Sequence, residues 1–182
     1  SQGLIEFSGL DVTELRGCHV RKTIHTRLVE GKDAVAATLK TLIKQIKRRE
    51  INLAAIYPLI YEEDNDDENI RSVAEAFNYW NGIFPDRVVA IHGRMPDVEK
   101  LAAIELFSKG NADIIVGTTV LEVGLDFPKL DAMMVHNPER LGVATVHQLR
   151  GRLARRGGDG HCYLMCPDPI DENRRQLFLT ME

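Results

Sequence analysis

Residues 113–119 have the sequence Asp-Ile-Ile-Val-Gly-Thr-Thr, a short apolar run that ends in a glycine and two hydroxyl side chains. A continuous apolar run of this length is typical of a strand buried on both faces of a parallel sheet. A glycine-framed acid follows at Gly124 and Asp126, and an arginine-rich stretch occupies residues 147–156. Hydroxyl, carboxylate and guanidinium groups together are suited to contacting phosphates and sugars. This part of the chain therefore indicates both the fold and the chemistry.

Outward from this stretch, similar apolar runs alternate with segments of helical periodicity. One helix is expected to begin at Asp33 as its N-cap, and another at Asp171. A third is expected to begin at Pro96 as its first helical residue and to end at Gly110. Two more helices are expected over residues 70–80 and 143–153. The expected strands are residues 24–29, 53–57, 88–91, 113–116, 132–136 and 162–165. This alternation predicts an α/β fold with one parallel sheet covered by helices on both faces.

Composition narrows the class of protein. The chain has 182 residues, 44% of them hydrophobic and 27% charged, with a formal net charge of −4. These proportions are ordinary for a globular domain. No apolar run approaches the roughly 20 residues needed to span a bilayer, and no signal peptide is recognisable at the start. The acidic balance disfavours a dedicated nucleic-acid-binding module but permits a local basic surface.

Cysteine and acidic residues give no indication of a metal site. Cys162 and Cys166 lie in a predicted strand, so buried free thiols in a reducing cytoplasm are expected for them. Cys18 leaves the number of cysteines odd. Residues 62–68 are almost all acidic and are expected to form a solvated loop.

The arginine-rich stretch has the spacing of a functional helix face. Gln148, Arg152 and Arg155 recur at i, i+4 and i+7, so on a helix they would project from one stripe. Guanidinium groups bind phosphate through paired donors, although an exposed basic helix end would explain the same residues. The chain contains no Gly-x-x-x-x-Gly-Lys-Ser/Thr loop, and Gly31-Lys32 lacks the rest of that motif. The arginines are therefore suited to a nucleotide that this chain cannot hold alone.

Four segments together resemble the second RecA-like lobe of superfamily two helicases, in the form found in RecG and Mfd. Residues 117–128 resemble motif V, and residues 137–142 continuing into 147–155 resemble motif VI. Residues 57–60 and 91–95 are similar to motif IV and the segment after it. The resemblance extends over about residues 20–182 and is nearest to RecG.

The resemblance implies a role for each matching position. ATP and Mg²⁺ would be held mainly by an N-terminal motor lobe outside this sequence, and the DNA, branched or duplex, would cross both lobes. Ala154 departs from the family, which usually has glycine there. The implied catalytic residues are Arg152 and Arg155 as arginine fingers and Gln148 as a coupling residue. Gly124 and Asp126 would lie beside the ATP ribose. The residues that would hold the DNA backbone are Gly93, Arg94, Lys100, Thr118 and Thr119.

These expectations define a division of the chain and a function. Residues 1–22 are expected to be an extended segment between lobes, residues 23–168 the RecA-like domain, and residues 169–182 the start of a helical extension. The expected function is that of the C-terminal motor lobe of a cytoplasmic RecG-type helicase in repair and recombination, inactive as an isolated lobe. The alternatives are the lobe of an Mfd-like translocase, a non-catalytic helicase-like binding or scaffolding module, and an unrelated α/β nucleotide enzyme, which would need its own phosphate loop.

Overall fold

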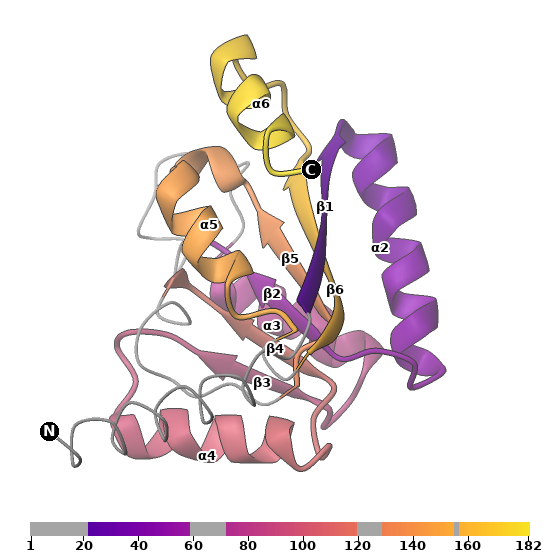
Figure 1. Cartoon of the computed structure of the whole chain (residues 1–182). Helices are drawn as coiled ribbons and strands as arrows, with labels where there is room; N and C mark the ends of the chain where they lie inside the picture. Colours follow the sequence, from indigo (N-terminus) through magenta and orange to yellow (C-terminus); the bar gives the residue numbers. More distant parts are fainter. Residues whose placement is uncertain (1–21, 59–71, 120–128, 155–156) are drawn as a thin grey trace, which may run out of the picture.

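The chain forms a six-stranded sheet in which every pair of neighbouring strands is parallel (Figure 1). The computed structural model describes residues 22–58, 72–119, 129–154 and 157–182. The strand order is β1-β6-β5-β2-β4-β3, which confirms the predicted α/β class. The strands are β1 (Lys22–Glu30), β2 (Leu53–Ile56), β3 (Val88–Ile91), β4 (Ile114–Gly117), β5 (Ala132–His136) and β6 (Gly158–Cys166).

Helices cover both faces of the sheet, because its central strands are apolar on both sides. On one face α4 (Asp97–Ser108), α5 (Val143–Arg150) and α6 (Glu172–Leu179) bury Phe107, Leu149 and Phe178 in a common cluster. On the other face, α2 (Lys32–Lys47) and α3 (Val73–Ile83) form a second cluster with the opposite sides of the same strands. A short 3-10 helix, η3 (Pro138–Arg140), follows β5.

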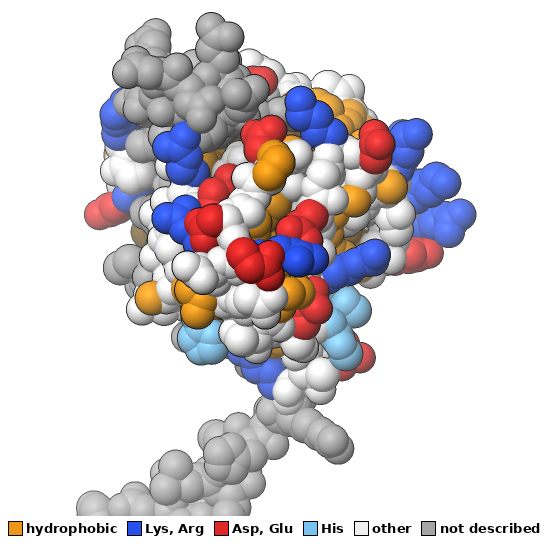
Figure 2. Space-filling model, turned by 90° about the horizontal axis from the view of Figure 1, so that it is seen from above, with side chains coloured by type: hydrophobic (Ala, Val, Ile, Leu, Met, Phe, Trp, Pro, Cys, Tyr) orange, Lys and Arg blue, Asp and Glu red, His pale blue; other side chains and the backbone are white. Residues whose placement is uncertain are grey.

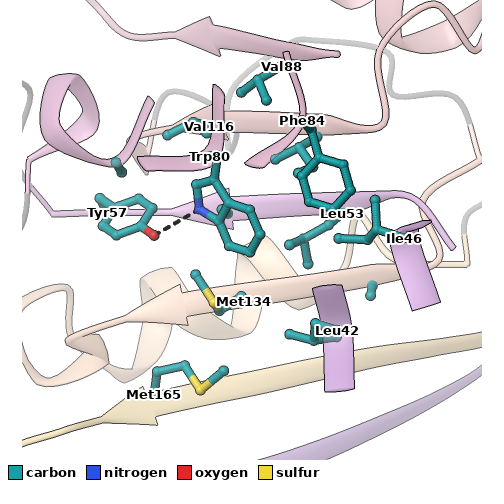
Figure 3. Packing of buried hydrophobic residues seen from close by; sticks show 14 of the residues in the cluster. Leu42, Ile46, Leu53, Tyr57, Trp80, Phe84, Val88, Val116, Met134 and Met165 are labelled. Atoms are coloured by element: carbon teal, nitrogen blue, oxygen red, sulfur yellow. Dashed lines mark hydrogen bonds between the residues drawn. The ribbon is translucent and has the colours of Figure 1, made fainter. Parts of the chain in front are cut away.

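The second cluster is centred on Trp80 of α3, which is fully buried (Figure 3). Its indole Nε1 donates a hydrogen bond of 3.2 Å to the hydroxyl of Tyr57, the residue that follows β2. The Tyr57 ring in turn stacks on His136 at the end of β5, with ring centroids 5.3 Å apart. The core on this face is therefore connected directly to the carboxyl edge of the sheet.

Several helix boundaries differ from the sequence-based expectation for local reasons. α2 begins one residue before Asp33, after Gly31, whose φ of 92° few other residues adopt. α3 is shifted to later residues because the side chain of Ser72 caps it by accepting from the amide of Glu75. Pro96 is the N-cap of α4 rather than its first residue, and Gly110 at φ 74° ends that helix as expected.

The two described cysteines are free and buried, as the sequence predicts. Burial raises the pKa of both Cys162 and Cys166 to about 12, so both thiols stay protonated and unreactive at neutral pH. Cys18 and the acidic residues 62–68 lie outside the described residues. In the described parts of the chain, no group of three or more His, Cys, Asp or Glu side chains could hold a metal ion, and no helix could span a membrane.

Candidate nucleic-acid and nucleotide interface

Three adjacent strands end at the same level on the carboxyl edge of the sheet. Ile56 of β2 and Ile91 of β3 both pair in register with Gly117 of β4. The amide of Thr118 donates to the carbonyl of Ile91 at 3.4 Å. The amide of Tyr57 donates to the carbonyl of Gly117 at 2.8 Å. The segments that follow these strands therefore form one surface, which brings together residues that are far apart in the sequence.

The residues predicted to hold a DNA backbone lie on this surface but differ in accessibility. Gly93 and Arg94 are exposed in a turn closed by the amide of Met95 donating to the carbonyl of His92 at 3.2 Å. A Cβ at Gly93 would meet no atom within 4 Å, so this backbone is open to a close approach from outside. Thr118 is only 8% exposed and Thr119 is half-buried, which leaves the Thr118 hydroxyl little surface for a ligand.

Lys100 reaches the same surface from the second turn of α4. Its side chain is 14% exposed, and its Nζ lies 3.5 Å from Asp97 Oδ1. Asp97 is almost fully exposed, and ion pairs with a solvated partner contribute at most about 1 kcal/mol. The pairing with Asp97 is therefore weak enough for a phosphate to replace it.

His92 directly precedes Gly93 and Arg94 in this turn. Its pKa is lowered from the usual range, first by burial and then by the positive charges of Arg94 and Lys100, while Glu99 acts in the opposite direction. At the end of the molecule where α6 lies, acidic and basic side chains alternate rather than separating into large patches (Figure 2).

The arginine-bearing helix is shorter than predicted. α5 ends at Arg150 rather than at Leu153, and Gly151 caps it. The next amides bond three residues back, from Arg152 to Leu149 and from Leu153 to Arg150, which tightens the chain into a turn. Ala154 then has a φ of 51°, a left-handed conformation that favours glycine.

This turn, residues 151–154, lies at the amino edge of the sheet. Lys22 Nζ, at the start of β1, donates to the carbonyl of Gly151 at 2.9 Å. The amide of Ala154 points to the carbonyl of Leu130, just before β5, at 3.5 Å. The start of β6 is also close, because a Cβ on Gly160 would lie 2.9 Å from the Cβ of Leu153. Three strand starts therefore fix the turn.

The candidate residues consequently form two groups rather than one. Gln148, exposed on α5, and Arg152, half-buried in the turn, belong to the amino edge, because α5 runs back across the sheet from the end of β5. The residues around Gly93 and Thr118 belong to the carboxyl edge. Arg155, Gly124 and Asp126 lie outside the described residues.

Three residues of these surfaces were not assigned a role from the sequence. His92 stands directly after a predicted strand and within the segment 91–95 that resembles the family, but neither signal gave it a role of its own. Lys22 contacts Gly151 across 129 positions of sequence, which no local pattern indicates. Gly160 lies inside β6, two residues after Gly158, and a glycine within a strand can mark a close backbone approach.

Gly160→Ala is expected to destabilise the chain by about 1–3 kcal/mol, because the added methyl group would overlap the side chain of Leu153 and push the turn 151–154 outward. Urea denaturation followed by circular dichroism measures the change. The matched control is Gly82→Ala in α3, where a Cβ meets nothing within 4 Å. That variant should gain about 0.5–1 kcal/mol from helix propensity. Equal effects of the two substitutions would contradict the close approach.

The chain has the features of a RecA-like lobe: parallel strands in this order, a cationic turn after β3 and an arginine-bearing turn after α5. Its sequence contains no phosphate-binding loop. The chain belongs to the family described as helicase conserved C-terminal domain, which matches residues 37–157. Both the Gly93 turn and the turn 151–154 fall within that match.

Individual relatives agree with this family. The chain is 43% identical over 122 residues to the ATP-dependent DNA helicase RecG of Aquifex aeolicus, a match that covers 66% of this chain and 15% of that protein. It is 36% identical over 185 aligned residues to RecG of Thermotoga maritima, covering 100% of this chain and 23% of that protein. The chain therefore spans less than a quarter of the length of either relative.

A solved structure of similar fold is that of the DUF1998 helicase MrfA bound to DNA. It superimposes with a TM-score of 0.64 at 16% identity, over 86% of this chain and 23% of that one. At this identity the likeness concerns the fold alone. It supports the assignment of a RecA-like fold.

Proposed function

We propose that this chain is the C-terminal motor lobe of an ATP-dependent DNA helicase of RecG type, acting on branched DNA in repair and recombination. The observation that carries the proposal is the turn 151–154, which three strand starts fix at the amino edge while Gln148 stays exposed beside it. The backbone that carries Arg152 is fixed at this edge, and a second lobe that brings a nucleotide to the edge would place its phosphates within reach of the arginine and of Gln148.

In this proposal the amino edge faces the nucleotide. Arg152, together with Arg155, would donate hydrogen bonds to the phosphate oxygens on which charge develops during hydrolysis. Gln148 would link that contact to the first lobe, and Gly124 with Asp126 would contact the ribose. ATP with Mg²⁺ would supply the phosphoryl group. The phosphate-binding loop and the metal ligands would come from the first lobe, since the sequence of these 182 residues contains no phosphate-binding loop.

The carboxyl edge faces the DNA. Arg94 and Lys100 would neutralise backbone phosphates, and the open backbone at Gly93 would allow a close approach. Thr119 would contribute through its half-buried hydroxyl, whereas Thr118 would contribute little, because its side chain is buried and its amide bonds to the carbonyl of Ile91. We place the whole protein in the cytoplasm, where its buried thiols would stay reduced.

The proposal predicts that the isolated 182-residue chain will not hydrolyse ATP above background, with or without DNA. The full-length protein that contains it should show DNA-stimulated hydrolysis in the same coupled assay. Turnover by the isolated chain would contradict the two-lobe arrangement. A folded full-length protein that binds DNA without hydrolysing ATP would instead favour a non-catalytic binding module.

A further inference from the structure

The outer side of α2 carries three lysines to which the proposed function gives no role. Lys40, Lys44 and Lys47 recur at i, i+4 and i+7, so their side chains project from one stripe of the helix, called here the lysine stripe. All three are exposed, whereas Leu42 and Ile46 bury another side of α2 against the sheet. Basic side chains project on the side of the molecule on which α2 lies in Figure 1 (Figure 2).

The lysine stripe has no acidic partner among the described residues. Within the described parts of the chain, none of its three ammonium groups has an ion pair or a hydrogen bond. The exposed Lys109 at the end of α4, by comparison, pairs with Glu105 at 2.6 Å. The positions three and four residues before and after Lys40 and Lys44 contain no Asp or Glu. The positive charges of the stripe are therefore not neutralised within the helix that carries them.

The electric field at the end of a helix accounts for only part of the lysine stripe. Basic residues beside the last carbonyls stabilise a helix, and Lys44 and Lys47 lie in the last turn of α2. Lys40 lies one turn earlier, where that effect has fallen off. Like charges four residues apart repel each other, so the pair Lys40 and Lys44 destabilises α2. An anion bound along the stripe would offset this repulsion.

The spacing of the lysine stripe fits the backbone of duplex DNA. Lys40 and Lys47 are about 10.5 Å apart along the helix axis, at about 1.5 Å for each residue. One strand of B-DNA carries a phosphate charge for about every 3.4 Å of its axis, so the stripe spans about three phosphates. An acidic protein would need carboxylates placed at the same spacing, whereas DNA presents phosphates at this spacing in every sequence.

We propose that the lysine stripe binds the phosphate backbone of a second duplex arm of the branched DNA. The inference rests on the DNA-binding function proposed above and adds a surface to it. α2 packs on the opposite face of the sheet from α4, which carries Lys100. It also runs from the carboxyl end of β1 back to the amino edge, where β2 begins. A duplex bound at the Gly93 turn would lie on the other side of the sheet, and a branch would bring another arm to the stripe.

The experiment measures the dissociation constant of the full-length protein for a fluorescent branched DNA at several salt concentrations. The double variant Lys40→Gln, Lys44→Gln removes two charges and keeps a similar helix propensity, so circular dichroism should show an unchanged fold. We expect binding at least about tenfold weaker than that of the wild type at low salt. The slope of log K against log salt should be shallower by about 1.8, for two contacts at about 0.9 each.

The matched control is Lys109→Gln, Lys129→Gln, which removes two charges from exposed lysines that pair with acidic side chains. This variant should keep the wild-type affinity and salt slope. Equal losses for the two double variants would show an effect of net charge alone and would overturn the inference. An unchanged slope in Lys40→Gln, Lys44→Gln would also overturn it and would leave the stripe to another partner, such as an acidic protein. No DNA binding by the wild type would overturn the proposed function itself.

Discussion

Arg152→Ala in the full-length protein is expected to lower the DNA-stimulated rate of ATP hydrolysis by about 1,000-fold or more. Removing an arginine that stabilises charge on a transferred phosphoryl group has effects of that order in related chemistry. Arg152 lies in the turn that Lys22 and Leu130 hold at the amino edge, so the backbone that carries this arginine is already fixed before a nucleotide arrives. Because the interaction is made mainly in the transition state, kcat should fall far more than KM rises.

Two further variants separate catalysis from folding. Arg152→Lys keeps the charge but loses the paired donors, and should recover only a small part of the rate. Arg48→Ala removes an exposed arginine after α2, which packs on the other face of the sheet, and should leave the rate unchanged. Near-normal hydrolysis by a folded Arg152→Ala protein would refute the assignment of this arginine to the nucleotide.

The class of fold could be predicted from the sequence because each central strand is a short apolar run between helical segments. Residues 53–56 and 114–117 have that form and are buried on both faces of the sheet. The strand order could not be predicted in this way. β1 pairs with β6 along nine residues that are about 136 positions away in the chain, and such pairing depends on tertiary packing rather than on local periodicity.

The candidate site was predictable in its residue types but not in its geometry. Helical spacing placed Gln148 and Arg152 on one stripe, yet the helix ends between them, because Gly151 caps it and the chain turns towards Gly160. The positive φ of Ala154 is decided by that packing, and alanine itself gives no local signal for it. Burial of Thr118 likewise depends on β3, which the local sequence does not specify.

Trp80→Ala is expected to reduce the free energy of unfolding of the chain by about 3–5 kcal/mol, the range measured for removing a large buried aromatic side chain. Trp80 is fully buried between α3 and the sheet, where it packs on Phe84 with ring centroids 6.4 Å apart (Figure 3). A typical domain is stable by only about 5–15 kcal/mol, so the loss would leave a large unfolded population near physiological temperature. Urea denaturation monitored by circular dichroism measures it.

Trp80→Phe distinguishes the packing of the ring from its hydrogen bond. The substitution keeps most of the apolar volume but removes the donor to the Tyr57 hydroxyl, so we expect a smaller loss of about 1–3 kcal/mol. Tyr57 also stacks on His136 at the carboxyl edge, so the phenylalanine variant should disturb the ends of β2 and β5 more than the distant turn 151–154. Amide hydrogen exchange resolves these segments. Equal losses for the two variants would show that the hydrogen bond, rather than the packed ring, dominates the contribution of Trp80.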